Sequence, residues 1–146
     1  MEPIITKQTD KATVYFTVRW SLITKAHKFE ILRQVPEMAG LFELYYMDEK
    51  NKLNLFYLGK AWLGGLRSRI RKMTDYTLEL DKKRREVLET KKCYYRFSLS
   101  DSFNDITDVF YFFSNTYFPH TSVAEHSGRY DLIYVQEITD EKIVTI

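Results

Sequence analysis

Three short stretches in the first half of the chain decide its fold: Gly40-Leu41-Phe42-Glu43-Leu44, then Phe56-Tyr57-Leu58-Gly59-Lys60-Ala61, then Gly65-Leu66-Arg67-Ser68-Arg69-Ile70. The polar segment 48–52 lies between two strand-like segments, so we expect residues 40–47 and 53–58 to pair as a hairpin. Glycine at the end of the second segment is expected to terminate that strand, and a basic helix is expected to begin near Leu66. The order is therefore strand, turn, strand, helix.

The rest of the chain continues to alternate between strand-like and helix-like patterns. Strands are predicted at 12–20, 93–99 and 130–138, and helices at 25–35 and 106–117, the latter after capping residues at 101–104. The charged run 78–90 is expected to continue the basic helix after a break, and residues 143–146 to return against 130–138. Together these patterns predict an α+β domain with a small, mainly antiparallel sheet flanked by helices.

Composition limits the class of protein. A chain of 146 residues with 45% hydrophobic residues is long enough for one domain with a packed core and too short to expect two. Its one cysteine, Cys93, excludes an internal disulfide and a thiolate metal cage. No apolar run is long enough to span a bilayer, and residues 1–7 lack the apolar segment of a signal peptide. We therefore expect no membrane partner and a cytoplasmic location.

Charge is distributed unevenly along the chain. The net charge is only +2, but residues 60–92 contain eleven Lys and Arg against five Asp and Glu, a local charge of +6. The remainder must then sum to −4. Such asymmetry is typical of a surface that binds phosphates, and it is equally typical of a solvated helix face. Because the basic stretch coincides with the three opening segments, both interpretations remain open.

In order and spacing, the opening segments resemble the GIY-YIG nuclease superfamily. Gly40-Leu41-Phe42 stands for the first triplet and Tyr57-Leu58-Gly59 for the second, and an arginine-bearing helix follows. The stretch from Tyr57 to Ile70 is especially similar to excision-repair members. The similarity covers about residues 40–122 of a single domain, 1–146. The N-terminal strand and helix (1–39) and the C-terminal strands (129–146) are then additions to a GIY-YIG-like core.

The resemblance implies a set of catalytic residues. In the family, two tyrosines lie near the attacking water, an arginine faces the phosphate and a helix glutamate holds one divalent cation. Tyr57 takes the place of one tyrosine, whereas Phe42 stands at the other and has no oxygen to act as acid, base or water ligand. Arg69 matches the arginine if residues 62–64 are a short insertion, and ungapped counting gives Arg67 instead. Either guanidinium has the geometry to bind a phosphate.

The metal position departs further from the family pattern. Counting back from Pro119 places Phe110 where the family has its glutamate. Asp108 lies near that position, and its carboxylate is the kind of ligand that Mg²⁺ prefers. An aspartate near a helix start also serves as a cap or interacts with the helix dipole, which is the alternative interpretation. No other cofactor is indicated.

Three functions follow as hypotheses. The first is a nuclease-like protein that binds DNA or RNA but has a degenerate, inactive site, with nucleic-acid contacts from Lys60, Trp62, Arg67, Arg69, Arg71 and Lys72. The second is an active endonuclease that uses Tyr57, an arginine and Mg²⁺ held by Asp108. The third is a protein-interaction module on the same fold, suggested by the eleven Tyr and ten Phe. The first is preferred because the residues at two catalytic positions lack oxygen.

Overall fold

The computed structural model describes residues 2–140 and 142–144, in which the chain folds into two sheets and four helices. In chain order, the elements are β1 (Ile5–Asp10), β2 (Thr13–Arg19), β3 (Ile23–Lys25), α1 (Lys28–Gln34), β4 (Gly40–Met47), β5 (Leu53–Ala61), α2 (Gly65–Met73), α3 (Lys82–Thr90), β6 (Cys93–Leu99), α4 (Phe103–Tyr117), β7 (Leu132–Ile138) and β8 (Ile143–Val144). The α+β class is confirmed. No helix in this described part is long and apolar enough to cross a membrane.

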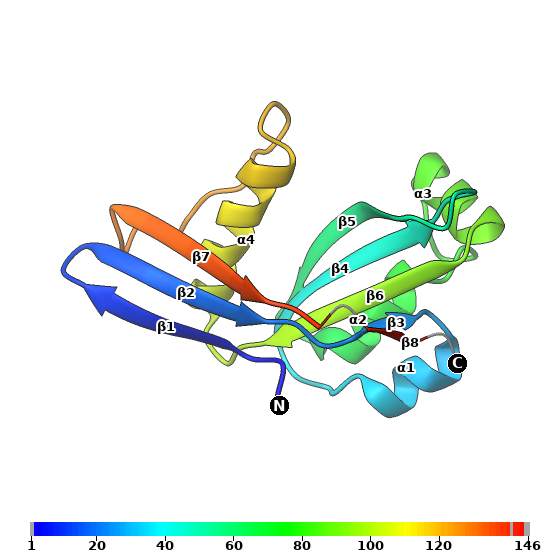
Figure 1. Ribbon diagram of the computed structural model, residues 1–146, viewed down its shortest axis with the longest axis horizontal. Coiled ribbons are helices and arrows are strands. Elements are labelled where there is room, and N and C mark those ends of the chain that lie inside the picture. Colours follow the sequence, from blue (N-terminus) through cyan, green and yellow to red (C-terminus); the bar gives the residue numbers. More distant parts are fainter. Residues whose placement is uncertain (1, 141, 145–146) are drawn as a thin grey trace.

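The strands form two sheets rather than one small sheet. A three-stranded sheet has the order β1-β2-β7, and a five-stranded sheet has the order β5-β4-β6-β3-β8. All strand pairs are antiparallel except β2–β7 and β3–β8. The two sheets extend in opposite directions from the centre of the molecule, so that the β1–β2 turn and α3 lie at opposite ends (Figure 1).

The predicted hairpin is confirmed, with one correction. Strands β4 and β5 pair antiparallel with a bulge near Leu44, but β5 continues to Ala61, so the prediction that Gly59 ends the strand is wrong. Gly59 pairs with Phe42, and a Cβ on Gly59 would collide with the Phe42 ring. Gly40 is equally constrained by the backbone carbonyl of Ser98. The glycines of both triplets are therefore needed for close packing inside the sheet.

Other boundaries also differ from the predicted ones. The first helix begins at Lys28 because residues 23–25 form β3. The charged run is helical after a break, as predicted, but its helix, α3, begins at Lys82 rather than near Leu78. Strand β1 was not predicted. The prediction that residues 143–146 return against β7 is wrong for Ile143 and Val144, which pair with β3, and residues 145–146 lie outside the described residues. The capping prediction is confirmed: the Ser102 hydroxyl accepts a hydrogen bond from the Asp105 N–H at 3.2 Å.

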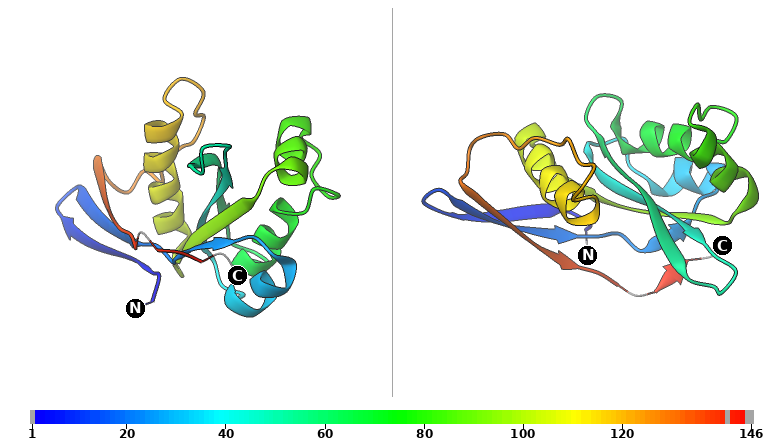
Figure 2. Two further views of the ribbon diagram at one scale, coloured as in Figure 1. Left: turned by 45° about the vertical axis from the view of Figure 1, so that its right-hand side comes forward. Right: turned by 90° about the horizontal axis from the view of Figure 1, so that it is seen from above.

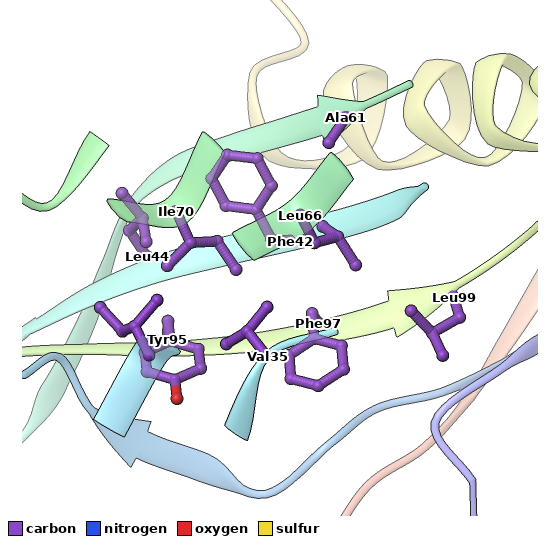
Figure 3. Close-up of a cluster of buried hydrophobic side chains, with 10 residues drawn as sticks. Val35, Phe42, Leu44, Ala61, Leu66, Ile70, Tyr95, Phe97 and Leu99 are labelled. Atoms are coloured by element: carbon purple, nitrogen blue, oxygen red, sulfur yellow. The ribbon is translucent and has the colours of Figure 1, made fainter. Parts of the chain in front are cut away.

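Two apolar clusters fill the opposite faces of the five-stranded sheet. The helix-side core lies beneath α1 and α2 and consists of Ile31, Val35, Phe42, Leu44, Ala61, Leu66, Ile70, Tyr95, Phe97 and Leu99 (Figure 3). The α4-side core consists of Ile5, Val14, Phe16, Val18, Trp20, Leu41, Leu58, Val109 and Phe113. Neighbouring residues of β4 point to opposite faces, so Phe42 enters the first cluster and Leu41 the second.

Helix α4 joins the two sheets. It packs between the three-stranded sheet and the β4–β5 hairpin, and its buried residues include Val109 and Phe113 (Figure 2). The outer face of the three-stranded sheet is left uncovered within the described chain. There the exposed rings of Tyr15 and Tyr134 stack on each other with centroids 5.4 Å apart. The three-stranded sheet is thus packed against α4 on its inner face and exposed on its outer face.

Candidate nucleic-acid interface

The start of α2 is fixed against the loop that precedes β4. Gly65 has a φ of 76°, and a Cβ there would lie 2.8 Å from the carbonyl carbon of Glu37. The Leu66 N–H donates to Met38 O at 2.8 Å, and the Arg67 N–H donates to Pro36 O at 3.3 Å. Since protein carbonyls already accept from these first-turn amides, the beginning of α2 is not an open anion site.

Arg67 strengthens the same connection. Its Nε donates to Val35 O at 2.7 Å, and its Nη1 donates to the Glu37 carboxylate at 2.7 Å. These bonds join α2 to the segment that follows α1, across 32 and 30 positions in sequence. One of the two candidate phosphate-binding arginines is therefore already engaged in joining α1 to α2.

The other predicted basic residues of α2 divide between two sides of the helix. Arg71 and Lys72 line a groove of about 430 Å³ between α1, α2 and the α2–α3 connection, where Arg67 also lies. Arg69 is exposed, but it is not among the residues that line this groove. Arg71 forms only a long ion pair with Asp75, at 3.8 Å. The structure therefore brings Arg67, Arg71 and Lys72 together and leaves Arg69 outside that group.

Tyr57 is covered by an arginine that the sequence did not identify. The Arg84 guanidinium of α3 lies over the Tyr57 ring, 5.2 Å from its centroid, and the same ring packs against Phe42 with centroids 5.8 Å apart. Arg84 comes 27 positions after Tyr57, in the basic run 82–85. The only sequence signal for it was the general excess of positive charge, which marks the whole run and no single member.

Glu79 holds Arg84 in this position. Arg84 Nη2 donates to Glu79 Oε1 at 3.3 Å, the Asp81 N–H donates to the same oxygen at 2.9 Å, and Arg85 Nε donates to the Glu79 backbone carbonyl at 2.9 Å. Burial opposes ionisation of Glu79, but the hydrogen bonds from Asp81 and Arg84 outweigh burial and hold its pKa below the ordinary value. Asp81 caps α3 by accepting from the Arg84 N–H at 2.9 Å.

Lys60 and Trp62 lie on the α4 side rather than with the groove. The Lys60 ammonium is 4.8 Å from the centroid of the Phe110 ring, and Trp62 meets Phe103 edge-on with centroids 5.6 Å apart. Both partners belong to α4. Trp62 remains 43% exposed, so it is an exposed aromatic ring, as predicted, but one that packs against the first turn of α4.

The residues around Asp108 do not fit a metal ion. Asp108 Oδ1 accepts from the Ser127 N–H at 2.7 Å, and Oδ2 accepts from the Ser127 hydroxyl at 2.9 Å and from Arg129 at 2.7 Å. Arg129 also binds Asp105, which in turn accepts from Lys7. The carboxylate is already surrounded by donors, and no group of three or more His, Cys, Asp or Glu in the described residues is arranged to hold a metal.

Tyr57 and Asp108 also lie on different faces. Tyr57 packs against the helix-side core, whereas α4, which carries Asp108, packs on the opposite face of the sheet. Phe42, at the position of the missing tyrosine, is completely buried in the helix-side core. The predicted arginine, tyrosine and carboxylate therefore do not surround one reacting phosphate.

A second ionic cluster on the α4 side escaped the sequence analysis. Glu43 is completely buried, and its Oε1 accepts from Arg96 Nε at 2.7 Å and from the Tyr45 hydroxyl at 2.5 Å. Arg96 also pairs with Glu137 at 3.4 Å, and its guanidinium lies over the Trp20 ring at 4.4 Å. Glu43 sits in an otherwise apolar strand, so only the pairing of β4 with β6, which places Arg96 opposite it, reveals its role.

In the same cluster, the phenols of two neighbouring tyrosines are weaker acids than an ordinary tyrosine. Burial, followed by the negative charge of Glu43, raises the pKa of both Tyr45 and Tyr117 above the ordinary value of 10.0. Both phenols therefore stay protonated at neutral pH. Arg96 and Glu43 neutralise each other inside the protein, which is a structural arrangement rather than an open site.

The basic residues between Lys60 and Lys92 are mostly unpaired. Three of the eleven, namely Arg67, Arg71 and Arg84, have a carboxylate within 4 Å. The other eight form no ion pair among the described residues: Lys60, Arg69, Lys72, Lys82, Lys83, Arg85, Lys91 and Lys92. All eight are exposed. Their charge is available to an external anion.

The chain belongs to a family whose model matches residues 4–146 and is described as "Uncharacterised protein". The match covers both sheets and all four helices of the described chain. No curated protein and no solved structure matches the chain. Membership of this family carries no stated activity, so the function has to be inferred from the chemistry of the surface.

Proposed function

We propose that this chain binds nucleic acid through the exposed basic side chains of α2 and α3 and that it does not cleave the phosphodiester backbone. The observation that carries the proposal is that five of the eight exposed basic residues without an ion pair among the described residues lie on these two helices: Arg69, Lys72, Lys82, Lys83 and Arg85. Lysines and arginines with free charge release counterions from phosphates when they bind, which favours association with polyanions.

The order of elements is compatible with the nuclease-like core. Strands β4 and β5, helices α2 and α3, strand β6 and helix α4 follow one another, with β4 in the centre of the β5-β4-β6 part of the sheet. This agrees with the strand, hairpin, strand and arginine-helix order on which the resemblance rests. The resemblance supports a nucleic-acid partner and leaves DNA and RNA as alternatives.

The chemistry argues against the active endonuclease. Phe42 offers no oxygen to an attacking water, and it is buried beneath α2. Asp108 is saturated by Ser127 and Arg129, on the other face of the sheet. Hydrolysis needs an activated nucleophile and charge stabilisation at the same phosphate, and the predicted groups do not converge on one point.

Binding is tested with two variants that remove equal charge from two different parts of the molecule. Lys72→Gln/Lys83→Gln alters α2 and α3, whereas Lys11→Gln/Arg19→Gln alters the three-stranded sheet, and none of the four side chains forms an ion pair among the described residues. Fluorescence anisotropy with labelled DNA and RNA is measured over a range of salt. The slope of log K, where K is the binding constant, against log salt concentration is negative. For the α2–α3 variant, we expect its magnitude to decrease by about two, one unit for each phosphate contact that is lost.

The matched variant distinguishes a specific surface from general charge. Lys11→Gln/Arg19→Gln should bind like the wild type, although its net charge changes equally. Equal losses in both variants would show that the α2–α3 surface has no special role. Salt-independent binding, or none, would contradict the proposal and favour the protein-interaction hypothesis.

Cleavage is tested with the same labelled strands in Mg²⁺ or Mn²⁺. We expect intact single-stranded and double-stranded substrates after prolonged incubation. Metal-dependent cutting that disappears in Arg69→Ala would overturn the non-cleaving part of the proposal and restore the endonuclease hypothesis.

A further inference from the structure

Two leucines contribute apolar surface to the groove between α1 and α2. The residues that line it include Leu32 of α1, Gly64 just before α2, Ser68 within α2, and Leu78 of the α2–α3 connection. Leu32 is 48% exposed and Leu78 is 57% exposed, so two large, exposed apolar side chains line a hollow of about 430 Å³. Large apolar side chains gathered around a hollow indicate a binding surface more strongly than isolated exposed ones do.

Positive charge also lines this groove. Arg71 and Lys72 both line it, and Lys72 has no ion partner among the described residues. Arg67 and Glu37 lie there as a mutually neutralised pair at 2.7 Å. The groove thus combines two apolar side chains and a mutually neutralised ion pair with two cationic side chains, which matches a ligand that has an apolar ring next to an anionic group.

We infer that this groove accepts an unpaired base of a single-stranded nucleic acid, with the adjacent phosphates bound by Arg71 and Lys72. This inference rests on the proposed function and names the class of substrate for the same surface. In a duplex, both faces of each base are stacked and its edge is paired, so the base cannot enter an apolar hollow without being extruded. Single strands present free base faces, which stack on aromatic side chains or pack against apolar ones.

The dimensions of the groove disfavour a peptide. An amphipathic helix needs a groove that follows several turns, and an extended peptide needs a free strand edge with which to form backbone hydrogen bonds. This groove is confined to the short α1, the neighbouring part of α2 and three residues outside the helices, Glu37, Gly64 and Leu78, and no strand residue lines it. Its volume is in the range of small-molecule sites, to which one base belongs.

The test compares a groove leucine with a matched leucine from the same connection. Leu78→Ser removes one wall, whereas Leu80→Ser alters a side chain that is 90% exposed and does not line the groove. Anisotropy is measured with a labelled single strand of DNA, the same sequence in RNA, and the corresponding DNA duplex. We expect Leu78→Ser to weaken single-strand binding about tenfold, because the base loses apolar contact with the leucine, while duplex binding changes less than twofold. Leu80→Ser should match the wild type.

A second variant fills the groove without altering its charge. Ser68→Phe places a ring in the hollow from the exposed side of α2, and we expect it to reduce single-strand binding by a similar factor while leaving the salt dependence unchanged. Urea unfolding of each variant confirms that the protein remains folded. If both Leu78→Ser and Ser68→Phe remain folded and both weaken single-strand binding, the loss is due to the altered groove and not to unfolding.

Different results separate this inference from the proposed function. If the wild type binds neither strand nor duplex, the proposed function itself fails. If it binds both equally, with the expected salt dependence, and neither Leu78→Ser nor Ser68→Phe discriminates between them, the proposed function stands and the groove inference is wrong. Equal losses for Leu78→Ser and Leu80→Ser would also overturn it.

Discussion

The two faces of the five-stranded sheet use charged residues in different ways. On the α4 side, Glu43 pairs with Arg96, and Asp108 pairs with Arg129, in buried or half-buried networks. On the opposite side, most basic residues of α2 and α3 are exposed and have no acidic partner among the described residues. The difference shows that charge count alone does not locate a functional surface. Short ion pairs inside the protein serve the fold, whereas exposed basic side chains with no partner or with only a long ion pair remain available to a ligand.

The largest effect is expected from breaking the buried pair on the α4 side. Arg96→Met leaves the Glu43 carboxylate buried without its partner, and we expect a loss of about 3–5 kcal/mol in the free energy of unfolding. Urea unfolding measures it. The double variant Glu43→Met/Arg96→Met should recover much of the loss, because no unpaired charge remains. A single variant as stable as the wild type would mean that this pair does not stabilise the fold.

A smaller loss is expected at Asp108. Asp108→Ala removes the acceptor for the Ser127 N–H and one partner of Arg129, at an expected cost of about 1–3 kcal/mol in unfolding free energy. Nucleic-acid binding should not change, with or without Mg²⁺, since the residue lies on the other face of the sheet. A selective loss of Mg²⁺-dependent activity, with stability unaltered, would instead favour the metal-ligand hypothesis.

The opposite outcome is expected on the basic face. Lys72→Gln/Lys83→Gln should change the free energy of unfolding by less than about 0.5 kcal/mol, because neither side chain forms an ion pair among the described residues. The same variant should lower nucleic-acid affinity. A large destabilisation with unchanged affinity would show that these basic residues stabilise the fold rather than bind nucleic acid.

The smallest effect is expected from acid titration of the α2–α3 connection. The pKa of Glu79 is lowered in the folded state, so its contribution to stability is present above the ordinary value of 4.5 and is lost as the pH falls through the lowered pKa. Limited proteolysis of the connection should therefore accelerate in that acidic range. In Glu79→Gln the rate of proteolysis should already be high at neutral pH and should depend less on pH. Equal pH profiles for the variant and the wild type would show that ionised Glu79 does not stabilise the connection.

The sequence located the central elements with few errors because local patterns specify them. Alternation and the polar turn predicted β4 with its observed bounds, and the β-branched and aromatic segments predicted β2 and β6. The local pattern wrongly predicted that the strand ends at Gly59. A glycine is required at this position because the ring of Phe42 on the paired strand leaves no room for a side chain. The local pattern failed again at the C-terminal strand, because nothing local indicates whether Ile143 pairs with β7 or with β3.

By itself, the sequence determined the class of fold, the run of positive charge and the absence of an oxygen at Phe42. Only the tertiary structure decided that Arg67 holds α1 to α2, that Arg84 covers Tyr57, and that Arg96 neutralises Glu43. The physical reason is the range of the interactions. Periodicity and capping act between residues a few positions apart, whereas ion pairs and ring contacts join residues that are distant in sequence and brought close only by packing.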